Sequence, residues 1–319
     1  MAGTILVTGA AGFIGSNLVE ALLRIGINVI GIDNFDPFYD RKVKERNIKD
    51  AVSSHCYNFE EGDIRNSDFV DSCFKKYRPD YIVHLAAKAG VRPSLARPQE
   101  YYDVNVMGTL NVLEKMKINH IQKMIFASSS SVYGNNSKVP FCETDYVDNP
   151  ISPYAATKRA GELLCYTYYH LYKFDISCLR FFTVYGPRQR PDLAIHKFIK
   201  AILNDDIISL YGDGTTSRDY TYIEDIVNGI LGAIDKVKGF DIFNLGEAKP
   251  VSLIDLVRTI ENSMGGNARL EYLPVQEGDV VQTFADITKA KAKIGYNPVI
   301  DINTGIKNYI DWIRLNNLN

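Results

Sequence analysis

The chain has 319 residues, of which 46% are hydrophobic and 23% are charged, with a formal net charge of −2. This composition is typical of a globular protein with enough length for one large domain or two smaller ones. The nearly balanced charge excludes a strongly basic nucleic-acid or anionic-membrane surface, and no apolar run approaches the roughly 20 residues of a membrane span.

The first predicted element is an apolar strand over residues 4–8, which runs directly into three glycines spaced three apart, Gly9, Gly12 and Gly15. Glycines there allow a tight turn and a close approach of the backbone to a pyrophosphate. A helix predicted over 13–25 would point its N-terminal N–H groups at the same phosphates. A loop that merely needs positive φ is the plainer alternative.

A second apolar run over 27–32 ends at Asp33. A carboxylate there accepts from an adenosine ribose hydroxyl and repels a 2′-phosphate, which favours NAD over NADP. Strand, glycine turn, helix, strand and acid agree in order, so we predict a dinucleotide site that holds NAD.

The first half of the chain alternates apolar runs with helical periodicity, the runs at 81–85 and 122–127 and the helices at 67–76 and 99–118. This alternation predicts an α/β fold with a Rossmann-type, doubly wound parallel sheet, whose ligands bind at the carboxyl ends of the strands. A long amphipathic helix over 153–173 and a strand over 176–182 follow.

After Gly186-Pro187, loops rich in Gly, Pro and charge separate shorter elements, which indicates a smaller C-terminal α/β lobe that binds substrate. We expect residues 1–182, with 219–245 returning to them, to form the NAD-binding domain. Residues 183–218 and 246–319 would form the substrate lobe.

Tyr154 and Lys158 are four residues apart on the predicted long helix and therefore share a face. A free tyrosine has a pKa near 10, but a lysine ammonium one turn away and a nicotinium ring would favour the phenolate. This spacing also occurs by chance on exposed helices; beside a dinucleotide fold, it predicts the catalytic pair. Lys158 would also hold the nicotinamide ribose.

A serine cluster, residues 128–131, follows an apolar strand at the end where ligands bind. One hydroxyl there, which we assign to Ser129, can hydrogen-bond the substrate oxygen that exchanges a proton. A polar turn is the alternative.

The cysteines are dispersed and the histidines form no ligand cluster, so we expect reduced thiols and no metal site. His84 ends an apolar run and is predicted to be a hydrogen-bonded structural histidine. The chain enters its first strand without a leader pattern, so we expect a cytoplasmic protein.

Together, T-G-x-x-G-x-x-G, the serine cluster before V-Y-G, Y-x-x-x-K and Tyr185-Gly186-Pro187 resemble the extended short-chain dehydrogenase/reductase superfamily over essentially the whole chain. The segment S-R-D-Y-T-Y-I-E-D, residues 217–225, is similar to a motif of nucleotide-sugar 4-epimerases. That resemblance implies a UDP-sugar substrate, with Arg218 facing its pyrophosphate, and a homodimer packed through helices of the large domain.

Three segments resemble UDP-glucuronate 4-epimerases: F-F-T-V-Y-G-P with Thr183, A-A-K-A-G-V-R at 86–92, and L-P-V-Q-E-G-D-V at 273–280. Galactose epimerases usually carry Asn in place of Thr183. Related dehydratases and decarboxylases carry acids after the serine, where this chain has Ser130 and Ser131.

The resemblance implies a transient oxidation, in which Tyr154 takes the proton of the sugar 4-hydroxyl and bound NAD takes the hydride from C4. The 4-keto sugar then rotates to present its other face, and the hydride returns to C4. NAD would stay bound through each turnover. Because a 4-keto uronate loses CO₂ easily, we expect Thr183, Arg190, Ser130 and Ser131 to restrain its carboxylate.

The resemblance also implies the remaining contacts. The cofactor set is Gly9, Gly12, Phe13, Ile14, Gly15, Asp33, Asn34, Asp63, Ile64, Leu85, Ala86, Ala87, Lys88, Asn105, Tyr154 and Lys158. The substrate set is Arg92, Ser129, Ser130, Ser131, Thr183, Arg190, Tyr211, Arg218, Gln276 and Asp279.

Several alternatives stay open. The same chemistry on UDP-glucose or UDP-N-acetylglucosamine is the nearest, followed by a UDP-glucuronate decarboxylase and by a net reductase that releases its cofactor. A non-catalytic NAD-binding regulator is a different class, but such proteins usually lose the Tyr/Lys pair that this chain keeps.

Overall fold

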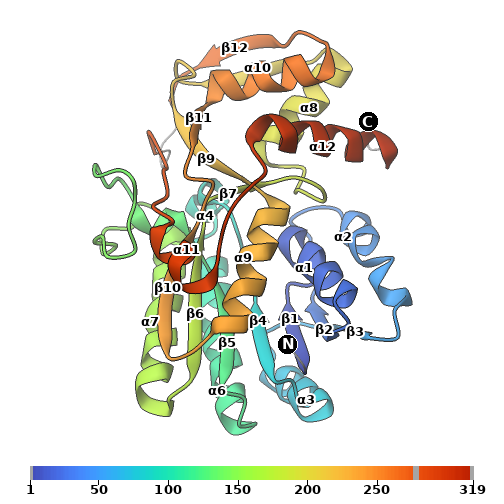
Figure 1. Ribbon diagram of the computed structural model, residues 1–319, viewed down its shortest axis with the longest axis vertical. Helices are drawn as coiled ribbons and strands as arrows, with labels where there is room; N and C mark the ends of the chain where they lie inside the picture. Colours follow the sequence, from blue (N-terminus) through green and yellow to red (C-terminus); the bar gives the residue numbers. More distant parts are fainter. Residues whose placement is uncertain (1–2, 276–279, 317–319) are drawn as a thin grey trace.

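The computed structural model describes residues 3–275 and 280–316, and a seven-stranded sheet organises most of them (Figure 1). Its strand order is β10-β6-β5-β4-β1-β2-β3, and each pairing is parallel. The strands are β1 (Thr4–Thr8), β2 (Asn28–Asp33), β3 (Tyr57–Glu61), β4 (Tyr81–His84), β5 (Lys123–Ser129), β6 (Asp175–Phe181) and β10 (Phe240–Leu245). The predicted Rossmann-type α/β fold is confirmed.

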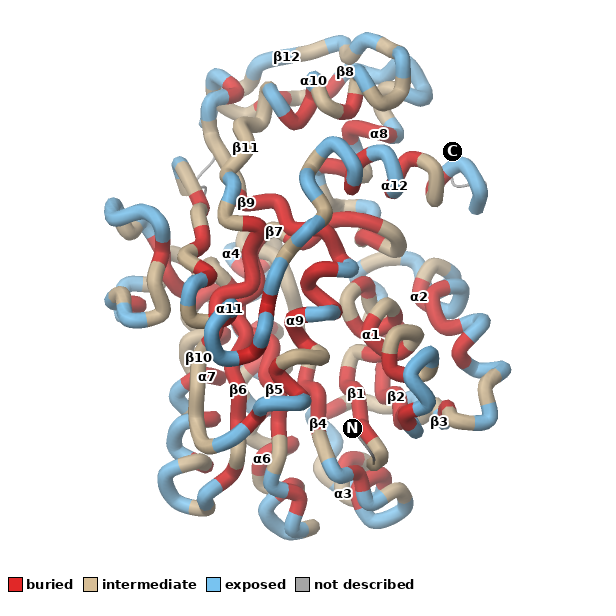
Figure 2. Tube along the Cα trace, viewed as in Figure 1, coloured by how far each residue is buried: buried red, intermediate tan, exposed pale blue. Residues whose placement is uncertain are grey.

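Helices cover both faces of this sheet because successive residues of each buried strand point to opposite sides. Ile5 and Val7 pack in one apolar core beneath α1 (Phe13–Arg24) and α9 (Ile223–Lys236). Leu6 packs in the other core. The helices over that second core are α3 (Ser67–Tyr77), α6 (Gly108–Ile118) and α7 (Pro153–Tyr172). Figure 2 shows the buried strands between these layers.

The segment between β2 and β4 holds two elements that local pattern does not predict, β3 and α2 (Arg41–Ile48). β3 reads Y-N-F-E-E and is an edge strand with only Tyr57 fully buried, so its sequence lacks a continuous apolar run. Short 3₁₀ turns, η1 (Ala51–Ser53) and η3 (Ser130–Tyr133), follow α2 and β5.

The helix predicted over 99–118 is interrupted. It consists of α5 (Pro98–Tyr102), a π-helical turn η2 (Asp103–Met107) and α6, and α4 (Val91–Ala96) precedes it. A π turn inserts an extra residue into the helix and re-aims its side chains. Here it places buried Asn105 against the loop that follows β4.

Smaller sheets form beyond Thr183. β7 (Thr183–Tyr185), β9 (Ser217–Tyr222) and β11 (Pro250–Ser252) make one, and β8 (Ile207–Tyr211) with β12 (Arg269–Leu273) makes another. Their helices are α8 (Ala194–Asn204), α10 (Leu253–Met264) and α12 (Ile302–Leu315), while α11 (Thr288–Ile294) packs with α9 and β10. Within 219–245, β9 joins the small sheet; α9 and β10 return to the large one. None of the helices in the described ranges is long and apolar enough to cross a bilayer.

Asp219 joins the returning segments. Its buried carboxylate accepts hydrogen bonds from the backbone N–H groups of Glu247 at 2.6 Å, Ala248 at 3.0 Å and Ala285 at 3.0 Å. Asp219, the acid of the R-D-Y motif, therefore has a structural role: it joins β9 to two later segments of the chain.

Candidate active site

One cavity of about 370 Å³ opens at the carboxyl ends of the central strands, where the fold predicts a ligand. It gathers most of the predicted site, which is widely scattered in sequence: Gly9, Gly12, Phe13, Ile14, Gly15, Asp33, Asn34, Asp63, Ile64, Leu85, Ala86, Ala87, Lys88, Ser129, Tyr154, Lys158, Thr183 and Arg190. The cofactor half and the sugar half of that list thus meet in one space.

The glycine turn is built for close approach. Gly9 has φ +72°, and a Cβ there would lie 2.9 Å from the Ala86 nitrogen. A Cβ on Gly15 would lie 2.1 Å from the Gly9 carbonyl oxygen, so α1 can pack against the turn only without one. Among the described residues, no side chain caps α1, whose first residues line the cavity. Its free N–H groups and positive dipole end fit a pyrophosphate.

Asp33 lies at the end of β2 and is 6% exposed. Its two oxygens accept hydrogen bonds from the Phe35 N–H at 2.8 Å and the Ala11 N–H at 3.1 Å. Lys44, an unpredicted residue of α2, places its Nζ 3.6 Å from Asp33 Oδ1. These contacts hold the carboxylate in place for a ribose hydroxyl, and Lys44 balances part of its charge.

Tyr154 is the second residue of α7, whose N-cap Ser152 accepts from the Ala155 N–H. The Tyr101 ring meets it edge to face, with centroids 6.2 Å apart. Burial raises the pKa of Tyr154 above its ordinary value, and a hydrogen bond with Ser129 and the charge of Arg190 oppose this rise. Tyr154 and Ser129 therefore lie within hydrogen-bonding reach of each other at the cavity wall.

Lys158 makes its own contact with the end of β5. The Lys158 ammonium donates to the Ala127 carbonyl oxygen at 2.7 Å, and burial lowers its own pKa to about 8. Lys158 lines the same cavity, where its charge faces the ligand space.

A buried ion pair that sequence reasoning missed supports this end of β5. The Glu162 carboxylate accepts from Arg180 Nε at 2.8 Å and Nη2 at 2.9 Å, and from the Ser128 hydroxyl at 2.6 Å. Glu162 continues the i, i+4 stripe of Tyr154 and Lys158 by one turn, which is the signal that would have found it. Through Ser128, it fixes the strand end that carries Ser129.

Arg190 reaches the cavity from the loop after β7, whose first residue is Thr183. Its guanidinium makes two 2.9 Å bonds to the Asp192 carboxylate and lies 5.2 Å from the Phe38 ring centroid. The cavity wall formed by β5 ends at Ser129. Ser130 and Ser131 begin the η3 turn beyond it, and the Ser131 hydroxyl accepts from Ser129 at 3.1 Å.

Other predicted substrate residues lie outside this lining. Arg92 of α4 stacks on Tyr211 at the end of β8, with its Cζ 4.8 Å from the ring centroid. Arg218 donates to the Ser217 carbonyl oxygen at 2.9 Å. Gln276 and Asp279 lie outside the described residues.

Asn105 is buried behind the lining. It accepts from the Lys88 N–H at 2.7 Å and donates to the Lys88 carbonyl at 3.0 Å, so it shapes the loop after β4. Many lining residues were not predicted: Ile32, Asp36, Phe38, Tyr39, Lys44, Gly62, Ala89, Gly90, Val104, Ala127, Ser128, Phe181, Phe182, Val184 and Leu193. Asp36 to Lys44 carry no local motif, and only the fold brings them here.

His84 is a buried structural residue, as predicted. Its Nδ1 lies 2.7 Å from the Thr8 hydroxyl and its Nε2 lies 3.1 Å from the Thr109 hydroxyl. Burial and the Lys158 charge lower the pKa of His84 to about 3, so the ring is neutral at pH 7.

This histidine should make the protein acid-sensitive. The unfolded chain binds a proton on His84 below pH 6.5, and the folded protein does so only near pH 3, so stability falls as the pH falls through that window. At pH 5, His84 lowers the free energy of unfolding by about 2 kcal/mol relative to pH values at which the histidine is neutral in both states. We expect His84→Gln to flatten the urea-unfolding free energy between pH 7 and pH 5. An unchanged slope would contradict this.

Comparisons with known proteins agree with this geometry. Residues 5–246 match the NAD dependent epimerase/dehydratase family. A UDP-glucuronate 4-epimerase of Thermodesulfobacterium geofontis is 45% identical over 315 residues, covering 98% of this chain and 97% of that protein.

Two solved structures match at a TM-score of 0.91, each covering 98% of this chain and 99% of the other. One is UDP-glucuronic acid 4-epimerase from Bacillus cereus with UDP-glucuronic acid and NAD, at 38% identity. The other is UDP-glucose 4-epimerase from Thermotoga maritima with UDP-glucose, at 33% identity. With a family match over most of its length and a relative alike from end to end, the chain belongs to the NAD dependent epimerase/dehydratase family.

Proposed function

We propose that this protein is a UDP-glucuronate 4-epimerase that interconverts UDP-glucuronate and UDP-galacturonate with NAD as its cofactor. The main observation in support is that Tyr154, Ser129 and Lys158 line the same cavity as the glycine turn and Arg190. The proposal is supported by the 45% identical UDP-glucuronate 4-epimerase and by the solved relative with UDP-glucuronic acid and NAD.

The geometry supports a division of labour within the cavity. Tyr154 would accept the proton of the 4-hydroxyl, and Ser129, which hydrogen-bonds Tyr154, would hold the same oxygen. Bound NAD supplies the hydride acceptor for C4 and the donor that returns the hydride to the opposite face. Lys158, buried beside the reacting groups, contributes positive charge that favours the phenolate.

The glycine turn and Asp33 would hold the cofactor, while Thr183 and Arg190 would hold the sugar. We propose that residues 1–182 with α9 and β10 serve NAD and that the later sheets serve the nucleotide sugar. Arg218 and the stacked pair Arg92 and Tyr211 remain our candidates for the UDP part, since guanidinium groups match phosphate oxygens.

Arg190 is our candidate for sugar selection. Asp192 accepts from Nε and Nη2 of Arg190, so a substrate carboxylate that binds there would replace an equivalent carboxylate. We expect Arg190→Ala to lower kcat/KM for UDP-glucuronate by about 100-fold, the loss of one charge-assisted bidentate contact. Because the carboxylate is then less restrained, CO₂ release per turnover should rise. The rate with UDP-glucose serves as the control, and an equal loss on both sugars would contradict the assignment.

The proposed function is tested by incubating the purified protein, without added cofactor, with UDP-glucuronate, UDP-glucose and UDP-N-acetylglucosamine in turn. NMR of the products should show inversion at C4 of UDP-glucuronate. Inversion of only the neutral sugars would overturn the glucuronate assignment, and CO₂ as the main product would favour a decarboxylase.

A homodimer is proposed as well. Large apolar side chains stand half exposed along α7 and the turn before α6, including Leu163 at 51%, Tyr166 at 50% and Met107 at 56%. Exposed apolar side chains on α7 and on the η2 turn that packs against it favour association through an isologous interface. Light scattering after gel filtration should give twice the 35.9 kDa chain mass, and a monomer would contradict it. A cytoplasmic location stays a prediction.

A further inference from the structure

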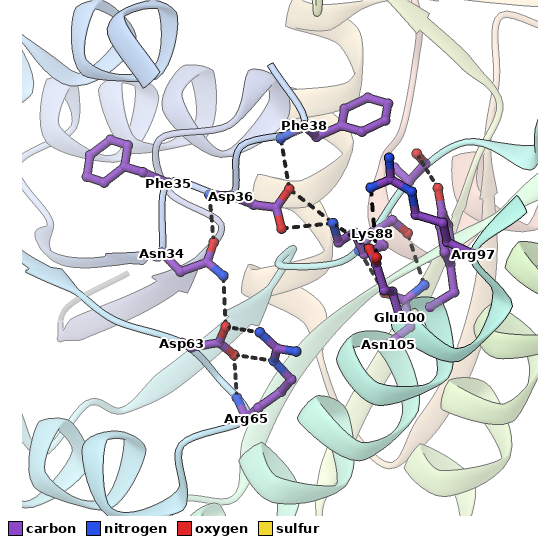
Figure 3. Close-up of polar contacts among 12 residues, drawn as sticks. Asn34, Phe35, Asp36, Phe38, Asp63, Arg65, Lys88, Arg97, Glu100 and Asn105 are labelled. Atoms are coloured by element: carbon purple, nitrogen blue, oxygen red, sulfur yellow. Dashed lines mark hydrogen bonds and ion pairs between the residues drawn. The ribbon is translucent and has the colours of Figure 1, made fainter. Parts of the chain in front are cut away.

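The ammonium of Lys88, a residue that lines the cavity, is held between two carboxylates (Figure 3). Its Nζ lies 2.9 Å from Asp36 Oδ2 and 3.2 Å from Glu100 Oε2. Lys88 and Asp36 line the cavity, whereas Glu100 belongs to α5 and stands outside the lining. We call Asp36, Lys88 and Glu100 the rim bridge.

The rim bridge spans the cofactor turn. Asp36 follows β2 and Lys88 follows β4, and these two strands flank β1 in the sheet. Adjacent strands are about 4.8 Å apart, so the Lys88–Asp36 contact crosses roughly two strand spacings above the carboxyl end of β1. That end is where the glycine turn begins, and Asp36, Lys88 and the glycines line the same cavity, so we expect the bridge to lie over the predicted pyrophosphate site.

The loop after β2 holds one end of the bridge in place. The Asp36 N–H donates to Asn34 Oδ1 at 2.9 Å, and Asp36 Oδ1 accepts from the Phe38 N–H at 3.0 Å. Asn34 in turn donates to Asp63, which Arg65 clamps, as Figure 3 shows. Asp36 is therefore positioned before it meets Lys88.

The loop after β4 and α5 hold the other end. Asn105 bonds both the N–H and the carbonyl of Lys88, which orients this residue at the rim. Arg97, one turn before Glu100 on the same side, lies 3.8 Å from Glu100 Oε1. Two carboxylates and two cations give the cluster a balanced charge, which favours ordered contacts over mutual repulsion.

The Lys88–Asp36 contact is partly buried, whereas Glu100 stands nearer the solvent. The side chains of Lys88, Asp36 and Glu100 are 16%, 25% and 44% exposed. Partial removal from water strengthens the attraction between the charges, while enough exposure remains for the pair to open.

We propose that the rim bridge slows the escape of NAD, with Asp36 and Glu100 acting as positioning residues for Lys88. This inference rests on the proposed function, in which NAD stays bound through each turnover. A dinucleotide behind the bridge leaves between the loops after β2 and β4 only after Lys88 parts from Asp36, which happens more often when Glu100 does not hold the Lys88 ammonium in place. Side chains from three segments would thus help to retain NAD, in addition to the direct contacts between protein and cofactor.

The test measures NAD release from Glu100→Gln, with Glu45→Gln as the matched control. Glu45 is also half exposed, at 49%, and pairs with Arg41 on α2 away from the cavity. The purified NAD-loaded proteins are diluted into a large excess of an NAD-capturing dehydrogenase, and the nucleotide that remains bound is quantified by chromatography after denaturation. We expect Glu100→Gln to release NAD about fivefold faster than wild type, the scale of one partly exposed ion pair.

Asp36→Asn, tested in the same way, should also speed NAD release. In the double variant Asp36→Asn/Glu100→Gln, the fold-increase in release rate should be smaller than the product of the two single fold-increases, because both carboxylates act on Lys88. Higher ionic strength should speed release from wild type more than from the double variant. Equal release rates for Glu100→Gln and Glu45→Gln would overturn the proposal, as would a wild type that loses NAD during gel filtration.

The sugar assignment can fail separately. With saturating NAD, Glu100→Gln should epimerise as fast as wild type. A protein that retains NAD through the bridge but does not invert UDP-glucuronate would keep this inference and overturn the proposed substrate.

Discussion

Tyr154→Phe is expected to lower kcat by about 1,000-fold or more while NAD remains bound. The proposal makes the Tyr154 phenolate the proton acceptor, and phenylalanine keeps the ring and its edge-to-face contact with Tyr101 while removing the oxygen. A positioned acid–base group contributes about 10² to 10⁴ in rate. The NAD content of the purified variant, measured after denaturation, should match wild type.

Tyr101→Phe is the matched control. Tyr101 is a neighbouring buried tyrosine whose hydroxyl donates to the Ala89 carbonyl at 3.1 Å. Its loss should cost about 1 kcal/mol of stability and little of kcat. If Tyr154→Phe kept a tenth of the wild-type rate, or if the two variants lost activity equally, Tyr154 would not be the proton acceptor.

Glu162→Gln is expected to destabilise the fold by about 3 to 5 kcal/mol, because it leaves the Arg180 guanidinium buried without a charge partner. The side chains of Arg180 and Glu162 are 1% and 0% exposed, and the pair also holds Ser128. The attraction of Glu162 raises the pKa of Arg180 against the opposing effect of burial, so the cation stays charged. Urea unfolding followed by circular dichroism measures the change.

Asp311→Asn provides the comparison. Asp311 pairs with Lys307 on α12 at 3.2 Å, with side chains 48% and 72% exposed. Neutralising this surface pair should change stability by less than about 0.5 kcal/mol. Ser128→Ala, which keeps the buried pair and removes one hydrogen bond to it, should cost about 1 kcal/mol. Similar losses for Glu162→Gln and Asp311→Asn would show that the buried pair is not a structural support.

Local pattern was sufficient for most of the large sheet. The runs at 4–8, 81–85 and 122–127 are continuous apolar strands because helices bury both faces of a parallel sheet. β3 and α2 escaped prediction because an edge strand needs apolar residues on few positions, and α2 is mostly charged. The interruption of the 99–118 helix by η2 is likewise a matter of how Asn105 is packed.

The chemistry divides in the same way. The sequence by itself determined the glycine turn, Asp33 and the Tyr154 and Lys158 pair, since each depends on spacing along one element or one strand–helix unit. Only the tertiary structure decided that Lys158 bonds the Ala127 carbonyl, that Glu162 accepts from both Ser128 and Arg180, and that Asp36 and Glu100 meet Lys88. These contacts join segments that packing alone brings together, so neither periodicity nor motif spacing carries them.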